Sequence, residues 1–167
     1  MKITLRNVEP DDDAFLFAAY ASSRAQEMAM VPWTDEQRTA FLRSQFNAQQ
    51  GDYNKRFADA QHGVILADGM PAGISRLQET DSEITIIDLI VMPEYRRQGI
   101  GTYLLGDYCA MAKTAGKPLR VYVETFNPSL QLFERLGFSR VADDGVYHLL
   151  EWDDPSDEAS PLQNGEA

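Results

Sequence analysis

Two arginines and two glycines near the middle of the chain have the types and the spacing to bind a phosphate. They lie in Arg96-Arg97-Gln98-Gly99-Ile100-Gly101-Thr102, between a proline-broken turn and a run with helical periodicity. The first N–H groups of a helix have no intrahelical partner and, with the helix dipole, they bind anions. Glycine lets phosphate oxygens approach the backbone, and guanidinium groups suit phosphate geometry. The segment therefore predicts a pyrophosphate site.

Two other phosphate motifs do not fit these residues. A Rossmann fingerprint requires a third glycine, and Leu104 stands in its place after Gly99 and Gly101. A P-loop requires lysine and a hydroxyl residue after Gly106, where the chain has Asp107-Tyr108. Packing alone also explains a Gly-x-Gly at a helix start, so that alternative stays open.

The same residues resemble the acetyl-CoA signature of the GNAT N-acetyltransferase superfamily, Gln/Arg-x-x-Gly-x-Gly/Ala. The resemblance covers about residues 1–152 in element order and is specific over 88–138. It implies an α/β (α+β) fold: a single GNAT-like domain over 1–152, in which about four helices flank a mixed, mostly antiparallel central sheet of about six to seven strands. It also implies acetyl-CoA as co-substrate.

The resemblance assigns cofactor-binding roles along the chain. Backbone groups of Leu89, Ile90 and Val91 would bond the pantetheine arm, and the amides from Arg97 to Thr102 would bind the pyrophosphate. Asn127 would face the cofactor, although Asn127-Pro128 is also typical of a helix N-cap. These roles fall on the following residues: Leu89, Ile90, Val91, Arg96, Arg97, Gln98, Gly99, Ile100, Gly101, Thr102, Asn127 and Phe133.

An amine that attacks a thioester must be neutral, so a base is expected. A lysine-type amine has a pKa of about 10.4 and an α-amine about 8, so a base helps most with the former. Asp88 and Glu83 are the acids on the expected strand. Because side chains alternate, only one of the two can face the cofactor unless the strand has a bulge. We favour Asp88, with Glu83 as the alternative and a solvated carboxylate as the ordinary reading of each.

Phe133 departs from the family pattern. Many GNAT enzymes have a tyrosine there, in the spacing Tyr-x-x-x-Gly-Phe, to protonate the CoA sulfur, and this chain has Phe133-Glu134-Arg135-Leu136-Gly137-Phe138. Phenylalanine cannot donate a proton, so the general acid is unassigned. Tyr108, Tyr122 and Tyr147 are substitutes, each more typical of core or surface. Cys109 has no activating neighbour and is a poor covalent carrier.

The acceptor site is expected at the two N-terminal helices and their connection. Arg24, Met28 and Trp33 lie where the resemblance implies a pocket wall. The alternative is that Met28 and Trp33 fill the core of a helix junction. No residue in the sequence identifies the acceptor substrate.

Periodicity predicts the elements that position these residues in the N-terminal half. Ile3 and Leu5 alternate as a strand, and Pro10-Asp11-Asp12-Asp13 opens a helix. Thr34-Asp35-Glu36-Gln37 resembles a capping box for a helix through about Gln49 that Gly51-Asp52 would end. Residues 64–67 and 73–77 predict a hairpin around Asp68-Gly69-Met70-Pro71.

The second half alternates strand and helix. Residues 84–91 are nearly continuous in apolar side chains and predict a central strand. A helix of about four to five turns follows from Gly99 to Gly116, and a strand at 119–124 comes next. A short helix over 129–136 ends at Gly137, with Phe138 able to pack back on it.

Composition narrows the possible partners. The chain has 167 residues, 44% of them hydrophobic, and a net charge of -11. Residues 153–167 hold five of the acids and no base, which predicts an acidic disordered tail. Without this tail the net charge is near -6, which argues against nucleic acid as a partner. No apolar run suits a membrane span, one cysteine excludes an internal disulfide, and no metal site is expected.

The leading hypothesis is a cytoplasmic N-acetyltransferase that acetylates a primary amine of a small molecule or peptide. The resemblance also makes a homodimer an expectation. A catalytically weak acyl-CoA binding or sensing module is the alternative, because of Phe133. A third reading gives the protein an interaction role through its acidic tail.

Overall fold

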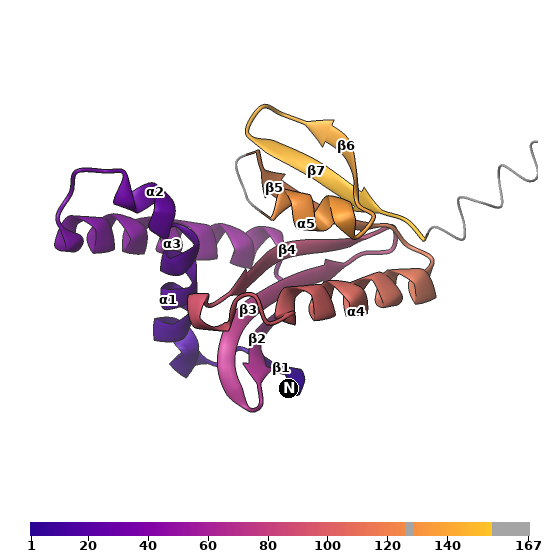
Figure 1. The fold of residues 1–167 in the computed structure, drawn as a ribbon, viewed down its shortest axis with the longest axis horizontal. Coiled ribbons are helices and arrows are strands. Elements are labelled where there is room, and N and C mark those ends of the chain that lie inside the picture. Colours follow the sequence, from indigo (N-terminus) through magenta and orange to yellow (C-terminus); the bar gives the residue numbers. More distant parts are fainter. Residues whose placement is uncertain (126–128, 155–167) are drawn as a thin grey trace, which may run out of the picture. The chain divides into compact units, whose positions relative to one another are not determined.

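The computed structural model describes residues 1–125 and 129–154. Over these residues it has seven strands and five α-helices, shown in Figure 1. The strands are Ile3–Asn7 (β1), Gln61–Ala67 (β2), Met70–Glu79 (β3), Ile84–Val91 (β4), Leu119–Glu124 (β5), Ser139–Asp143 (β6) and Tyr147–Trp152 (β7). The helices are Asp13–Ser23 (α1), Ala25–Ala29 (α2), Asp35–Arg56 (α3), Ile100–Ala115 (α4) and Leu130–Arg135 (α5), with 3-10 turns at Pro10–Asp12 and Pro93–Tyr95.

The strands form one mixed sheet in the order β1-β2-β3-β4-β5-β7-β6. Strand β1 is antiparallel to β2, and β7 is antiparallel to both β5 and β6. The pair β4 and β5 is parallel. The predicted fold class and the central place of β4 are therefore confirmed.

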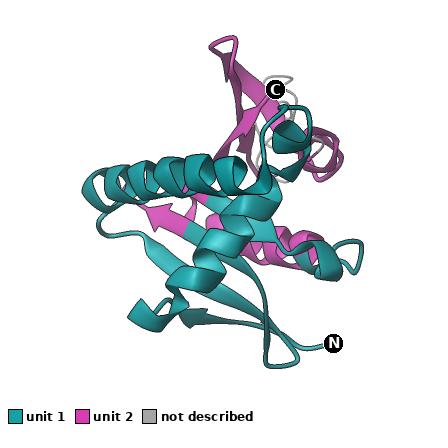
Figure 2. Ribbon diagram, turned by 90° about the vertical axis from the view of Figure 1, so that its left-hand side faces the viewer, with its two compact units in different colours: residues 1–76, 88–100 teal, residues 77–87, 101–167 magenta. Residues whose placement is uncertain are grey.

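The described chain divides into two compact units, coloured separately in Figure 2. Unit 1 comprises residues 1–76 and 88–100, and unit 2 comprises 77–87 and 101 onward. Strands β3 and β4 each contribute residues to both units. The expected division into 1–152 and an acidic tail stays a prediction, because residues 155–167 lie outside the described ranges.

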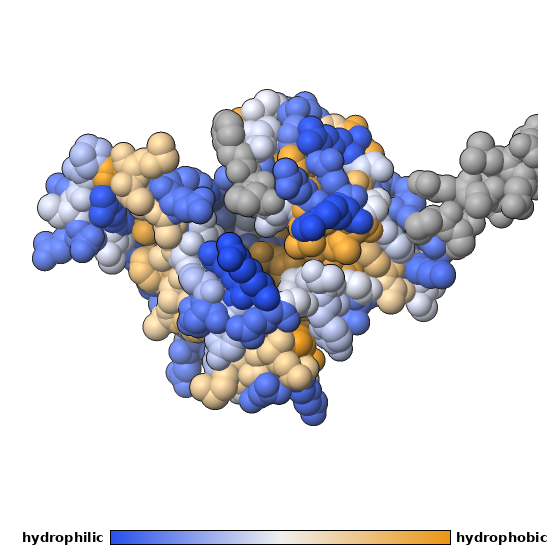
Figure 3. Space-filling view, in the orientation of Figure 1, coloured by the Kyte–Doolittle hydropathy of each residue, from blue (hydrophilic) through white to orange (hydrophobic). Residues whose placement is uncertain are grey.

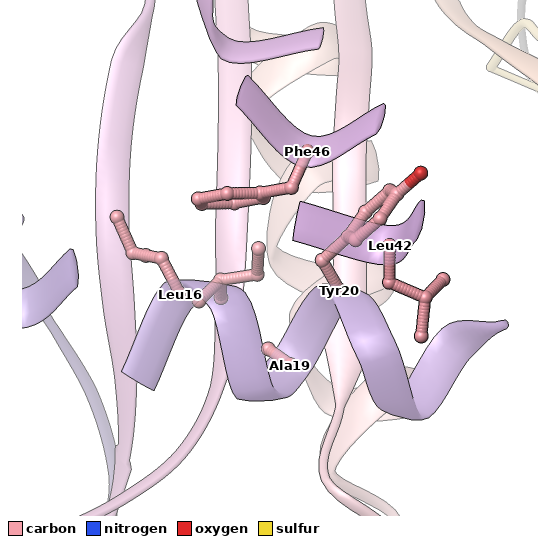
Figure 4. Packing of buried hydrophobic residues seen from close by; sticks show 6 residues of the cluster. Leu16, Ala19, Tyr20, Leu42 and Phe46 are labelled. Atoms are coloured by element: carbon pink, nitrogen blue, oxygen red, sulfur yellow. The ribbon is translucent and has the colours of Figure 1, made fainter. Parts of the chain in front are cut away.

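The core of unit 1 is built by α1, α3 and the inner strands. Figure 4 shows Leu16, Ala19 and Tyr20 of α1 facing Leu42 and Phe46 of α3. The Phe46 ring lies 5.6 Å from the Tyr20 ring. Ile74 of β3 belongs to this cluster, and Ile90 and Met92 at the end of β4 pack against it.

Unit 2 has a core with the predicted periodicities. Alternate residues of β5 are buried, and α4 buries residues at helical spacing. These buried residues are Leu119, Val121 and Val123 of β5 and Leu104, Leu105, Tyr108 and Ala112 of α4.

Three local signals formed as the sequence predicts. Thr34 and Gln37 make both hydrogen bonds of the capping box at the start of α3. The β2–β3 hairpin turns at Asp68-Gly69, where both φ angles are positive. Helix α5 ends in a Schellman motif, since the Phe138 N–H donates to the Phe133 carbonyl and the Gly137 N–H to that of Glu134.

The predicted end of α3 at Gly51-Asp52 is wrong. The helix continues to Arg56, because Arg56 forms an i,i+4 ion pair with Asp52 at 2.7 Å and the Tyr53 and Phe57 rings pack 5.7 Å apart. The tertiary setting thus overrides the low helix propensity of a single glycine. Helix α2 was not predicted and brings the count to five.

No helix within 1–125 or 129–154 is long and apolar enough to cross a membrane.

Candidate functional site

The segment after β4 forms a loop with unusual backbone geometry. Between Pro93–Tyr95 and the start of α4 at Ile100, Arg97 has φ 63° and Gly99 has φ 83°. Left-handed backbone is uncommon for arginine, and such residues concentrate at functional loops. The loop is tied down by the Arg96 Nε, which donates to the Val91 carbonyl at 2.9 Å.

The loop is open where a phosphate would lie. Apart from the adjoining residues and the backbone of the helix itself, no described atom lies within 4 Å of a Cβ added at Gly99 or at Gly101. Packing therefore does not explain these two glycines. Arg96, Arg97 and Gln98 are exposed, whereas Ile100 is buried and anchors the start of α4. Thr102 lies in the exposed first turn of α4.

Upstream of the loop, β4 contains a bulge. The Met92 N–H donates to the Ala72 carbonyl, and the Thr80 N–H donates to the Glu83 carbonyl. Between these bonds β3 advances eight residues and β4 advances nine, so β4 carries one extra residue. Because of this extra residue, the alternation of side chains does not show which of Asp88 and Glu83 is the better candidate for the base. The surroundings of the two carboxylates must be compared instead.

The backbone of β4 around Leu89–Val91 is set by close contact with β3. A Cβ at Gly73 would overlap the Ile90 carbonyl oxygen and lie 3.1 Å from the Val91 Cα, so only glycine fits there. On the other edge of β4, pairing with β5 joins 84–86 to 119–121 and stops there among the described residues.

Asp88 is a partly buried carboxyl in unit 1. Burial raises its pKa to about 6, while Arg76, Arg24 and a hydrogen bond from the Leu89 N–H act in the opposite direction. Among the described residues it has no ion-pair partner. A carboxyl with these properties is largely ionised at neutral pH and can accept a proton.

Glu83 has a different setting, in unit 2. Arg120 contacts Glu83 at 3.1 Å and Glu151 at 3.2 Å, so Glu83 is one member of a three-residue ion-pair network. Such networks are structural features of many proteins. Its surroundings do not resemble those of a proton acceptor awaiting substrate.

Beside Asp88 lies a group of polar residues that the sequence did not reveal. Arg76 of β3 is only 3% exposed. Its Nη2 donates to the Gln50 Oε1 at 2.8 Å and lies 2.9 Å from the His62 Nδ1, and its guanidinium lies 5.0 Å from the Tyr53 ring centre. The one available signal was an arginine within a strand whose other residues are mostly apolar or small.

Comparison with known proteins decides the family. The acetyltransferase (GNAT) family model matches residues 22–138, which include the glycine loop and Asp88. The chain belongs to this family.

Solved structures agree with the family assignment at the level of fold. PaiA N-acetyltransferase from Thermoplasma acidophilum, solved in complex with coenzyme A, is 20% identical, with a TM-score of 0.70 over 92% of this chain and 100% of that one. The ribosomal-protein-S18-alanine N-acetyltransferase from Escherichia coli is 22% identical, with a TM-score of 0.56 over 90% and 91%. No curated protein matches the chain significantly in sequence. As a GNAT acetyltransferase, the chain is an acyltransferase of a family that uses acyl-CoA.

In this GNAT chain, the three residues expected to bind the acceptor have separate settings in unit 1. Arg24 pairs with Glu27 at 3.3 Å and lies 5.6 Å from the Tyr20 ring centre. Met28 packs against the α1–α3 core, as the core-filling alternative predicts. Trp33 is 38% exposed and packs edge-on against Phe41 at 5.2 Å. Figure 3 shows hydrophobic surface over α2, next to which Met30 is 86% exposed.

The remaining predicted residues of the acetyltransferase fall in unit 2 or outside the described ranges. Phe133 is buried and packs edge-on against Phe138 at 5.2 Å, as part of the α5 Schellman motif. Asn127 lies outside the described residues. Within 1–125 and 129–154, no group of three or more potential ligands is placed to hold a metal.

The tyrosines considered as alternative acids differ in their exposure. Tyr108 is buried, and Tyr122 is 62% exposed. Tyr147 is also exposed. Burial raises the pKa of the Cys109 thiol to about 11, so it is a thiol and not a thiolate at neutral pH.

Proposed function

We propose that this protein is an acetyl-CoA-dependent N-acetyltransferase that acetylates a primary amine of a small molecule or peptide by direct attack. One observation carries the proposal. A single short segment, residues 88–101, contains both a carboxyl whose pKa is raised by burial to about 6 and an open glycine loop at the start of a helix.

The loop has the donors and the space that a pyrophosphate needs. The amides from Arg97 to Thr102 would bind it, with charge from Arg96 and Arg97. Backbone groups of Leu89, Ile90 and Val91 would bond the pantetheine arm. Asn127 and Phe133 keep the cofactor-facing roles that the family resemblance gives them.

Asp88 is the proposed base. Acetyl-CoA supplies an electrophilic thioester carbonyl. As the amine nitrogen bonds to the acetyl carbon, the carbon–sulfur bond would break and CoA would leave as its thiolate, while Asp88 takes the amine proton and later releases it to solvent. A base with a pKa of about 6 combines ionisation at neutral pH with useful proton affinity. Glu83 is the weaker candidate, because Arg120 already pairs with it.

Acceptor contacts are proposed for Arg24 and Trp33. Arg24 acts electrostatically on Asp88, and Trp33 offers an exposed aromatic surface on the same unit. Met28 would contribute through its packing against the α1–α3 core.

A pair of glycine substitutions tests the cofactor site. Leucine at position 101 meets no described atom within 4 Å of its Cβ, and the same holds at Gly106 one and a half turns further along α4. Leucine also has a better helix propensity than glycine. Both Gly101→Leu and Gly106→Leu should therefore fold. We expect Gly101→Leu to raise the acetyl-CoA dissociation constant at least about tenfold, roughly 1.4 kcal/mol, by calorimetry.

Gly106→Leu is the matched control and should bind acetyl-CoA like the unmodified protein. Equal, undiminished binding by both variants would contradict the cofactor assignment. A loss of binding by both would indicate a general disturbance of α4.

The second candidate is a catalytically weak acyl-CoA sensing module. The observation in its favour is Phe133, a buried side chain that has no proton to donate. This candidate predicts tight acetyl-CoA binding without release of CoA in the presence of amines. A role through the acidic tail, and assembly as a homodimer, stay predictions.

A further inference from the structure

A buried arginine without a carboxylate partner is the feature of unit 1 that the proposed mechanism has not used. Arg76 is 97% buried, yet its hydrogen-bond partners, Gln50 and His62, are both neutral. Among the described residues it forms no ion pair, and its buried Nε has no hydrogen-bond partner. A buried charge that no carboxylate contacts destabilises a fold strongly. We therefore expect the buried charge of Arg76 to have a function.

The strands place Arg76 next to Asp88. Strands β3 and β4 are neighbours in the sheet. The hydrogen bond from Met92 to Ala72 and the one from Thr80 to Glu83 give registers that differ by one residue, which place Asp88 opposite Arg76 or opposite Ser75. In either register Arg76 is within one residue of the position across from Asp88. The guanidinium and the carboxyl act on each other electrostatically, and no ion pair between them is found among the described residues.

The guanidinium is held in place from two sides. Gln50 and Tyr53, both on α3, contact it from one side, and His62 of β2 contacts it from another. Arginine only donates hydrogen bonds, so the His62 Nδ1 must accept and the imidazole must be neutral. Burial and Arg76 lower the pKa of His62 to about 4, which keeps it neutral wherever Asp88 is ionised.

We propose that Arg76 is a positioning residue for acetyl transfer: a buried cation, fixed by Gln50 and His62, that keeps Asp88 in its carboxylate form while leaving that carboxylate free to take a proton. A direct ion pair would hold the carboxylate too strongly, whereas burial without a cation would keep it protonated. This inference rests on the proposed role of Asp88 as the base.

The charged groups that act on Asp88 are Arg76 from β3 and Arg24 from the α1–α2 junction, with the Leu89 N–H as a hydrogen-bond donor. Arg76 is in turn affected by Tyr53 of α3. His62 of β2 is neutral over the relevant range. Arg76 is the more buried of the two cations, so its charge is the less screened.

Neutral variants of Arg76 test the proposal. Arg76→Gln keeps polarity and Arg76→Met replaces the buried cation with an apolar chain of similar length, so one folded variant is enough. Asp88 is titrated in each protein by the carbon-13 shift of its carboxyl. We expect its pKa to rise by about one unit or more above that of the unmodified protein. Arg56→Gln, at an exposed arginine that pairs with Asp52, should leave the titration unchanged.

The pH dependence of kcat/KM supplies the second measurement. In the Arg76 variants the acidic limb of the kcat/KM profile should shift to higher pH by the same amount as the pKa of Asp88. Activity should recover toward high pH. Arg76→Lys, which keeps the charge, should restore the limb to within a few tenths of a pH unit. A purely structural role would lower the rate equally at every pH.

Unchanged titration of Asp88 in a folded neutral variant would overturn the proposal. A shifted Asp88 titration with an unmoved rate profile would support the electrostatic effect of Arg76 but contradict Asp88 as the base. Failure of this inference is thus distinguishable from failure of the proposed mechanism.

Discussion

The Asp88 carboxyl loses a proton less readily in the folded chain than in the unfolded one. Its folded pKa of about 6 lies above the unfolded value of 3.8. Between these values the folded state binds more protons, so ionisation of Asp88 destabilises the fold as pH rises from about 4 through 6. This unfavourable charge lies where the proposed reaction needs a base. Functional sites commonly lower the stability of a fold in this way.

Replacing Asp88 with asparagine should therefore stabilise the protein in a pH-dependent way. We expect Asp88→Asn to raise the free energy of unfolding by about 1–2 kcal/mol at pH 7.5, after part of the gain is lost because Arg76 loses a nearby anion. At pH 4, where Asp88 is already protonated, the difference should nearly vanish. Urea unfolding at both pH values measures it, and equal effects at the two would contradict the burial of the charge.

At the scale of elements, the approach of β3 to β4 shapes the proposed pantetheine region. Gly73 lies against the Ile90 carbonyl and the Val91 Cα, within the stretch over which β4 carries its extra residue. Backbone does not yield as a flexible side chain would. The two strands can therefore keep their spacing only with glycine at position 73.

Gly73→Ala should disturb both the fold and the site. We expect the free energy of unfolding to fall by about 2–4 kcal/mol, because the new methyl group overlaps backbone atoms of β4. Acetyl-CoA affinity should fall as well if Leu89–Val91 bond the pantetheine. Gly106→Ala, in open space on α4, should leave stability unchanged or slightly raised by comparison. Equal stability of the two variants in urea would show that β3 and β4 can move apart.

The sequence predicted those elements whose signals are local. The Thr34 capping box and the Asp68-Gly69 turn depend on a few neighbouring residues, and both formed. The end of α3 did not follow from Gly51, because contacts made by Asp52, Tyr53 and their partners extend the helix. Burial of Arg76 depends on α3 and β2, which are 14 to 26 residues away in sequence, so no local pattern revealed it.

At the scale of the whole molecule, one short motif was enough to indicate the family and much of the fold. The glycine loop is specific because backbone chemistry at a helix start requires those residues, whereas acceptor recognition depends on side chains whose roles vary. The net charge of -11 says little about the acceptor, since the two charged side chains that act on Asp88 are both arginines. Activity must therefore be measured with a range of amines.

Release of the CoA thiol from acetyl-CoA, with and without a panel of primary amines and peptides, tests the central claim most directly. The unmodified protein should release CoA faster with at least one amine. Asp88→Asn should lose about 100-fold or more of that rate at neutral pH while binding acetyl-CoA about equally well. Tight acetyl-CoA binding with no amine-dependent release would contradict catalysis by this protein, and an Asp88→Asn rate equal to that of the unmodified protein would contradict the proposed base.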